Sequence, residues 1–421
     1  MFARKRRSPL PEWAIPLCYA VSAVPAGIIL PRLENRFLSI SSSITTAVAL
    51  TILSSITSGM IALTGIVFSL AFVMVQFSAV AYSPRLVAWV SRDPVIWHSI
   101  GIFTATFLYA IADMAWIDRA GSGRVPFFST WVVVVLTLAS VGMFVALIQR
   151  VGLLQIGRTL AFTSKLGRDA IEQMYLPIES PASISNSDET GRSSVTRTIV
   201  YFGEPQALQA IDGPILLALA TEAAARVEVV ASVGDTLITH QPLMHVFGDK
   251  SNVLDETWRG AFELGADRTF EQDPKYAIRI LVDIAIKALS PAINDPTTAV
   301  QALDHIQDQL VRLGRKRLEI GALHDGQGVL RLTIPHPSWE DFLRLAFDEI
   351  RFCGGNSVQV TRRLRALIND LIAALPTERH PALEHHRERL NASEARSFSD
   401  EEEKLEASEE DRQGLGVRAE R

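Results

Sequence analysis

The stretch from Ser43 to Val80 reads SITTAVALTILSSITSGMIALTGIVFSLAFVMVQFSAV, and the wider run from Phe37 to Pro84 contains no Asp, Glu, Lys or Arg. A helix of about 20 apolar residues already crosses a lipid bilayer. Water-soluble helices of this length carry charges on at least one face. The stretch therefore predicts a membrane-spanning helix.

Small and hydroxylated side chains recur along this stretch every three or four residues, so they share one face of the predicted helix. They are Ala47, Thr51, Ser54, Ser58, Ala62, Gly65, Ser69, Val73 and Gln76, whereas the opposite face carries Leu53, Ile56, Met60, Leu63, Val67, Leu70 and Met74. Because a hairpin would reset the phase of the stripe at its turn, the pattern predicts one helix that crosses once.

The small-residue face allows two interpretations. Small side chains let neighbouring helices approach closely, and hydroxyls can form hydrogen bonds across the contact. In a homo-oligomer the same face can line a polar path through the membrane. The candidate packing or pore residues are Thr51, Ser54, Ser58, Ala62, Gly65, Ser69 and Gln76.

Three further apolar runs bring the expected membrane spans to four, at about 13–30, 52–80, 95–117 and 127–149. A cleaved signal at the first run is the alternative, since Ala23 to Ala26 offers small residues for cleavage. With four crossings, the basic residues of Arg4–Arg7, Arg85, Arg92, Arg150 and Arg158 all fall on one side, as the positive-inside rule requires of the cytoplasmic side. We therefore expect both termini in the cytoplasm.

The residues after 152 have the composition of a soluble domain, so the expected fold class is an α-helical membrane domain followed by a mixed α+β, mostly helical cytoplasmic domain with a small β unit. The expected divisions are a transmembrane domain (1–152), a linker helix with a flexible loop (153–196), a β-rich unit (197–250), a helical domain (251–395) and a disordered acidic tail (396–421). Within the helical domain, periodicity predicts helices at Thr257–Arg268, Pro274–Leu289, Pro296–Leu313, Trp339–Phe352 and Val358–Leu375.

Composition excludes several classes of protein. The formal net charge is −5, and eight acids against one lysine between Asp400 and Asp411 account for it, which leaves no basic field for nucleic acid. The two cysteines fit a reducing compartment and predict no disulfide. There is no phosphate-binding loop, no nucleophile elbow and no Cys-x-x-Cys motif, so we expect no enzyme activity and no cofactor.

Two Asp-Pro pairs, Asp273-Pro274 and Asp295-Pro296, mark helix starts, because Asp caps free N–H groups and Pro fits the first helical position. They are structural corners or, since helix N-termini also bind anions, part of a ligand or partner site. The candidate residues for such a site are Glu271, Arg279, Asp283, Asn294 and Asp295. A network of ion pairs on a solvated helix face gives the same pattern.

Ionisable residues elsewhere suggest weaker candidates. His98 and Asp113 fall within the third span, where such groups have functional roles in many membrane proteins, but both lie near the span ends and are expected to reach the interface. His380, Glu384 and His385 do not have the His-Glu-x-x-His spacing of a helical zinc site, so we predict no metal.

The run RTFEQDP (Arg268–Pro274) and the run ALSPAINDP (Ala288–Pro296) resemble signature segments of the uncharacterised bacterial membrane proteins of domain-of-unknown-function family 2254. Segments around Gly65-Ile66-Val67-Phe68-Ser69 and Leu208–Asp212 are similar to its membrane and β regions, and the resemblance covers roughly Trp13 to Leu375. It implies a multi-pass protein of the bacterial inner membrane with a cytoplasmic domain, and it brings no established activity.

The sequence favours two functions, ahead of a third, an enzyme without short motifs that acts near the membrane. The first is a homo-oligomeric channel or transport-type protein with a cytoplasmic regulatory domain. The second is a membrane-anchored sensor or scaffold whose cytoplasmic domain binds a small molecule or a partner protein. The expected partners are the lipid bilayer, further copies of the chain and that ligand, and nucleic acid is not expected.

Overall fold

The computed structural model describes residues 11, 13–37, 44–81, 94–117, 125–151, 156–178, 194–248 and 253–416. The basic segments with Arg4–Arg7, Arg85 and Arg92, and most of the loop predicted to be flexible, lie outside the described residues. The chain forms two compact units, one spanning Arg6–Arg158 and the other Thr159–Arg421. We call them the four-helix unit and the C-terminal unit, and describe each by itself.

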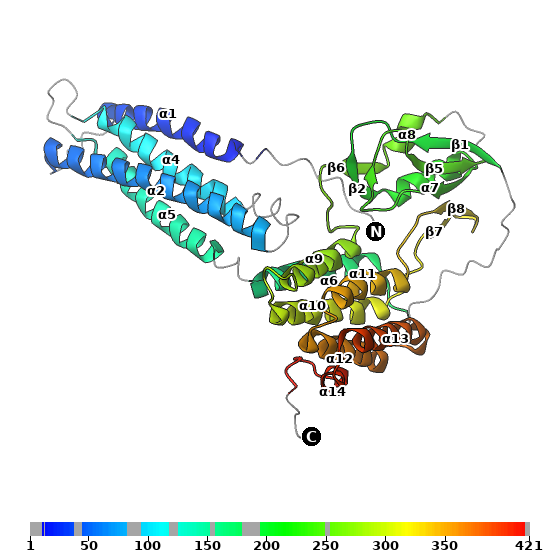
Figure 1. Cartoon of the computed structure of the whole chain (residues 1–421). Helices are drawn as coiled ribbons and strands as arrows, with labels where there is room; N and C mark the ends of the chain where they lie inside the picture. Colours follow the sequence, from blue (N-terminus) through cyan, green and yellow to red (C-terminus); the bar gives the residue numbers. More distant parts are fainter. Residues whose placement is uncertain are drawn as a thin grey trace. The chain divides into compact units, whose positions relative to one another are not determined.

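The four-helix unit consists of α1 (Ala14–Phe37), α2 (Thr46–Ala81), α4 (Pro94–Met114) and α5 (Phe127–Val151) (Figure 1). All four are long and apolar enough to cross a membrane. The predicted single crossing of Ser43–Val80 agrees with α2, an unbroken helix of 36 residues. The charge-free sequence thus forms one continuous helix, which begins earlier than residue 52.

Helix α4 is the centre of the four-helix unit. Half of the residues in its apolar stretch are buried, against 17% in each of the other three helices, because α1, α2 and α5 all pack on α4. Two glycines permit the close approach of α1 and α4: a Cβ on Gly101 would lie 2.5 Å from the ring of Tyr19, and one on Gly27 would lie 2.8 Å from Ala112. Among the described four, α4 is therefore the most deeply buried helix.

The β-rich part of the C-terminal unit contains two sheets (Figure 1). The strand order is β1-β5-β3-β8-β7 in one and β4-β2-β6 in the other, and only β3 and β8 pair in parallel among the described strands. The strands are β1 (Val195–Val200), β2 (Gln206–Ile211), β3 (Arg226–Val229), β4 (Thr236–Leu237), β5 (Pro242–Phe247), β6 (Phe262–Gly265), β7 (Ala322–His324) and β8 (Leu330–Thr333). Helices α7 (Gly213–Glu222) and α8 (Asp255–Arg259) complete this part.

Two expectations about the β-rich part need correction. The predicted helix Thr257–Arg268 is wrong, because α8 ends at Arg259 and the next residues form β6, which pairs with β2. The β unit also extends beyond the predicted 197–250, since β8 joins the sheet edge from far along the chain. Strands this short carry too little periodicity to be separated from helix by sequence alone.

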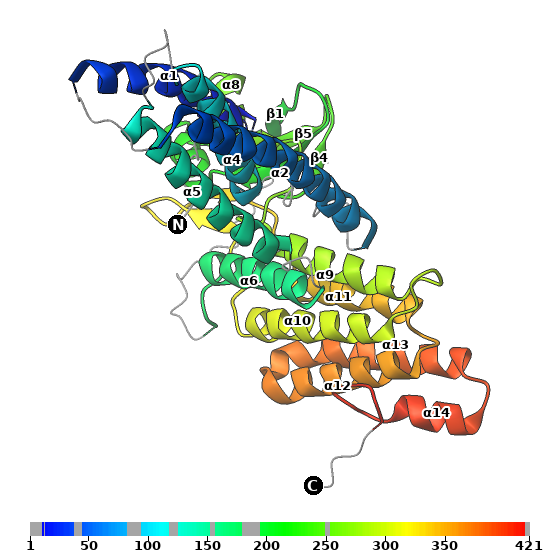
Figure 2. The same cartoon turned by 90° about the vertical axis from the view of Figure 1, so that its left-hand side faces the viewer.

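The remaining helices pack together, and we call them the helical layer. They are α6 (Ile156–Met174), α9 (Pro274–Ala288), α10 (Pro296–Gly314), α11 (Trp339–Cys353), α12 (Val358–Ala374), a 3₁₀ turn (Thr377–Arg379), α13 (His380–Ser397) and α14 (Glu401–Ser408). Figure 2 shows α6, α9 and α10 lying side by side, with α12 and α13 beyond them. Both Asp-Pro pairs begin helices as predicted, at α9 and α10.

Two further boundaries differ from the expected divisions. Helix α6 is no free linker, because Gly167 lies so close to α9 and α10 that a Cβ there would come within 2.7 Å of Ala277 and Gln309. The acidic tail is ordered as far as residue 416, in correction of the predicted disorder. The tail contacts α12 through charges of both signs: Arg362 of α12 pairs with Glu409 of the tail at 3.9 Å, and Arg412 of the tail pairs with Asp370 of α12 at 2.7 Å.

Candidate functional site

The two faces of α2 have opposite surroundings within the four-helix unit. On the bulky side, Leu53, Met60 and Val67 are buried against the neighbouring helices. On the other side, every candidate residue is exposed: Thr51, Ser54, Ser58, Ala62, Gly65, Ser69 and Gln76. We call these seven residues the α2 small-residue face.

The small size of this face has no packing role inside the described four-helix unit. A Cβ added to Gly59 or to Gly65 would meet no atom within 4 Å. Two of its hydroxyls donate within the helix: Thr51 Oγ1 to the Ala47 carbonyl at 2.8 Å and Ser69 Oγ to the Gly65 carbonyl at 3.1 Å. The α2 small-residue face is therefore available to lipid or to another protein chain.

The five candidates for a ligand or partner site fall into two groups, and the first, Arg279 and Asp283, lies in the middle of α9. Arg279 donates through Nε to Asp283 Oδ1 at 2.7 Å and through Nη2 to Glu349 Oε2 of α11 at 2.8 Å. These hydrogen bonds raise the pKa of the Arg279 guanidinium, and the bond to Glu349 has the largest effect. The sequence could not identify Glu349, because it lies 70 residues away on another helix. The three side chains form an ion-pair network that joins α9 to α11.

The other three candidates lie at the ends of α9. Glu271 precedes the helix, whereas Asn294 and Asp295 follow it, and 15 residues at about 1.5 Å each place the two ends roughly 22 Å apart. Asp295 caps α10 by accepting from Thr298 N at 3.1 Å, and Asn294 has a φ of 50° in the turn between the helices. The five candidates therefore do not form one cluster, and Asp295 has the capping role.

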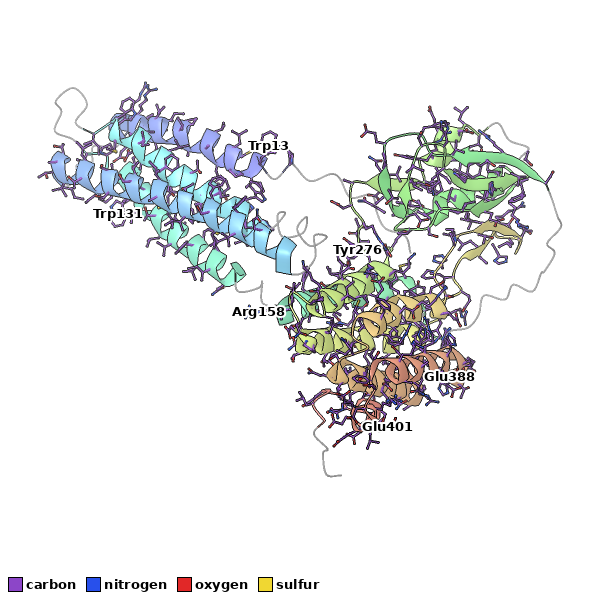
Figure 3. The ribbon with its side chains drawn as sticks, viewed as in Figure 1. Trp13, Trp131, Arg158, Tyr276, Glu388 and Glu401 are labelled. Carbon is purple, nitrogen blue, oxygen red and sulfur yellow. The ribbon has the colours of Figure 1, made fainter. Side chains whose placement is uncertain are left out.

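A cavity lies at the start of α9, between the β-rich part and the helical layer, near Tyr276 as labelled in Figure 3. Its volume is about 30 Å³, and its polar lining residues are Tyr175, Ser232, Gln272, Asp273, Lys275 and His336. We call it the Asp273 cavity. A space of this size holds about one water molecule or a small ion.

Asp273 is the least expected residue of the cavity. Its side chain makes no cap bond to α9, and Arg268 Nε donates to its Oδ2 at 2.9 Å instead. Among the described residues, neither Asp273 Oδ1 nor the Tyr175 hydroxyl has a hydrogen-bond partner, and both residues are at most 2% exposed. A buried polar atom without a partner costs free energy, so the cavity offers unsatisfied bonding capacity to a small guest.

The RTFEQDP run (Arg268–Pro274) and residues in contact with it shape this cavity. Gly234 has a φ of +95°, and a Cβ there would lie 2.6 Å from Asp273 Oδ2, so only glycine fits. Gln272 Oε1 accepts from the Ile211 backbone N–H at 3.1 Å and ties the segment to β2. The RTFEQDP run is therefore the joint between the sheets and α9.

Burial governs the charges around the Asp273 cavity. It raises the pKa of the Asp273 carboxyl, against the opposing effect of Arg268, and it raises the pKa of the Tyr175 hydroxyl. It lowers the pKa of His336 to about 4, assisted by Lys275. His336 is therefore neutral at physiological pH.

The ionisable residues of the third span are less accessible than expected. His98 meets the Tyr19 hydroxyl at 3.3 Å, whereas Asp113 is fully buried, in correction of the expectation that it reaches the interface. The reason is the packing of α1 and α5 around the end of α4. In the described part of the chain, no three metal-binding side chains gather, and His380 contacts the Leu375 carbonyl.

Comparisons with known proteins give a family and no activity. The family model described as predicted membrane protein (DUF2254) matches residues 11–370. An uncharacterized protein of Mycobacterium bovis and one of Mycobacterium tuberculosis are each 25% identical over 328 residues, which cover 76% of this chain and 62% of each relative. The match thus spans less than two thirds of their length. No solved structure matches the chain.

Proposed function

The chain belongs to the DUF2254 family of predicted membrane proteins, and we propose that it is a homo-oligomeric channel or transport-type protein in which the α2 small-residue face meets further copies of the chain. The bacterial inner membrane is the proposed location, with both termini and the C-terminal unit in the cytoplasm. The C-terminal unit then has a regulatory role.

One observation carries this proposal: the small side of α2 is exposed along its length, although nothing in the described four-helix unit requires it to be small. Lipid tails make no demand for small or hydroxylated side chains. A neighbouring helix does, since small residues allow backbones to approach and form van der Waals contacts. The seven exposed residues include four hydroxyls and the Gln76 amide, which suit a polar path between copies.

The orientation is supported by charge. Arg150 and Arg158 follow the last span, and the positive-inside rule favours the cytoplasm for such residues. In intact cells, externally added protease should leave the C-terminal unit uncut. Cleavage of that unit before cell lysis would contradict the orientation.

Two glycine variants test self-association and flux. Gly65→Leu fills the α2 small-residue face, and Gly142→Leu makes the same change on α5, where a Cβ also meets nothing. In detergent the wild-type protein and Gly142→Leu should have the mass of an oligomer, whereas Gly65→Leu should be smaller. In liposomes only Gly65→Leu should lose potassium or chloride flux. A wild-type protein that is monomeric and conducts neither ion would refute the proposal.

The second candidate function, a sensor, is favoured by the Asp273 cavity. Its unpartnered Asp273 Oδ1 and Tyr175 hydroxyl would bind a small polar guest at the joint between the sheets and the helical layer. Thermal unfolding of the full chain should be titrated with ammonium chloride, sodium chloride and sodium phosphate. A midpoint that rises with one salt in the wild type and not in Asp273→Asn would support this function, and identical responses to all three salts in the two proteins would count against it.

A further inference from the structure

A cluster of buried polar side chains lies where α1 and α4 end and α5 begins. Glu34 and Asp113 are 3% and 0% exposed, and both contact Ser129. This cluster belongs to neither of the two sites described above. Two carboxyl groups in an otherwise apolar helix bundle require a cation or a proton, because an isolated buried charge is too costly.

The surroundings of Glu34 favour its charged form. Its Oε1 accepts from the backbone N–H groups of Phe127 and Phe128, the latter at 3.0 Å, and its Oε2 accepts from Ser129 N at 3.1 Å. Glu34 thus caps the first turn of α5 from another helix. Backbone donors and the positive end of the helix dipole both stabilise a carboxylate at this position.

Asp113 has far less support. Ser129 Oγ donates to its Oδ1 at 2.5 Å, and the Tyr109 hydroxyl lies 2.9 Å from the same Ser129 Oγ. Because the serine proton is used on Asp113, Tyr109 must donate to Ser129. The nearby Thr130 hydroxyl donates to the Pro126 carbonyl at 2.6 Å. Asp113 Oδ2 is buried without any partner among the described residues.

No basic side chain offsets this pair within the described helices. Helix α2 contains no titratable residue at all, and the described part of α5 contributes none near the cluster. On α4, His98 lies at the opposite end of the helix with Tyr19. On α1, the exposed Arg32 lies over the Trp116 ring, 4.7 Å from its centroid, and Arg36 is also exposed.

From this geometry we infer that Asp113 is a proton-binding site of the four-helix unit, with Glu34 as the charged member of the pair. A metal ion fits poorly, since it needs several oxygen ligands, and both Glu34 oxygens and Ser129 Oγ are already engaged. A proton needs only Oδ2. Its loss would place a second negative charge beside the carboxylate that caps α5 and would loosen the junction of α1, α4 and α5.

Infrared spectroscopy of the full chain in liposomes tests this inference. At neutral pH, the wild-type protein should show the C=O band of a protonated, buried carboxylic acid. Asp113→Asn should lose the band, and Glu34→Gln should keep it. A wild-type spectrum without the band, or a band lost only in Glu34→Gln, would overturn the inference.

A second measurement does not depend on the folding of the variants. The same wild-type band should disappear when the pH is raised, and the thermal midpoint should fall by several degrees over the same range. Sodium and potassium chloride should leave the band unchanged at neutral pH. If either salt removes it and raises the midpoint, the site binds a metal cation and the proton assignment is wrong.

Discussion

Helices α9 and α2 are both rich in aliphatic residues, yet the chain covers only one of them. In α9, Ile278, Ile280, Leu281, Val282 and Ile284 are at most 1% exposed, because α6, α10 and α11 pack against this helix. In α2, Ile52, Ile61 and Ile66 are between 43% and 56% exposed. The C-terminal unit thus supplies the apolar surroundings of α9, whereas the four-helix unit leaves one side of α2 uncovered, the side that we propose meets other copies of the chain.

The largest expected effect is in α9. Leu281→Ala should destabilise the C-terminal unit by roughly 2–5 kcal/mol, because a fully buried side chain leaves a cavity. Ile52→Ala on the exposed side of α2 is the matched control and should change unfolding by less than about 0.5 kcal/mol. Denaturant unfolding of both variants measures the difference. Equal losses would remove the distinction between the two helices.

Removing a charge partner at the start of α9 is expected to be nearly as costly. Arg268→Ala leaves Asp273 buried without its cation and should cost about 3 kcal/mol. The double variant Arg268→Ala with Asp273→Asn should recover part of that loss, since no uncompensated charge remains. If the double variant is no more stable than the single one, the ion pair is not what stabilises the joint.

The third prediction concerns pH. Burial lowers the pKa of His386 to about 4, from about 6.5 in an unfolded chain, so the unfolded state takes up the proton first as the pH falls. This contribution is constant above pH 6.5 and is lost towards pH 4, by up to about 3 kcal/mol. His386→Gln should therefore show a smaller loss of stability than the wild type between pH 6.5 and 4.5. Parallel pH profiles would rule out a titrating His386.

The smallest expected effect is on α2. Gly65→Leu should change the unfolding of the four-helix unit by less than about 0.5 kcal/mol, because its Cβ enters open space. The same holds for Gly142→Leu. Thermal unfolding in detergent at protein concentrations too low for association is the appropriate measurement. A loss of several kcal/mol would mean that the α2 small-residue face packs inside its own protomer.

The sequence predicted most of the helices because their signals are local. The absence of charge between Phe37 and Pro84 predicts α2 as one long apolar helix, and the Asp-Pro pairs predict where α9 and α10 begin. The sheets were less accessible, since β3 and β8 pair across about 100 residues of intervening chain. Docking of the acidic tail depends on Arg362 and Asp370, whose positions on α12 give no local sign of their partners.

The candidate sites were predictable only in part, for the same reason. Periodicity grouped Arg279 with Asp283, but Glu349 comes from another helix. Asp273 was recognised as a helix start, whereas its pairing with Arg268 and its closeness to Gly234 required the fold. A signal was present, since the residues of the joint stand together in the RTFEQDP run.

Cross-linking on α2 tests the central claim most directly. Ser58→Cys should be made in a background with Cys18→Ser and Cys353→Ser, because both native cysteines are exposed, and Gly142→Cys in the same background serves as control. Under mild oxidation in native membranes, Ser58→Cys should form a disulfide-linked dimer and Gly142→Cys should stay monomeric. A Ser58→Cys protein that stays monomeric, or equal dimer formation by both variants, would contradict an α2 small-residue face that meets its copy.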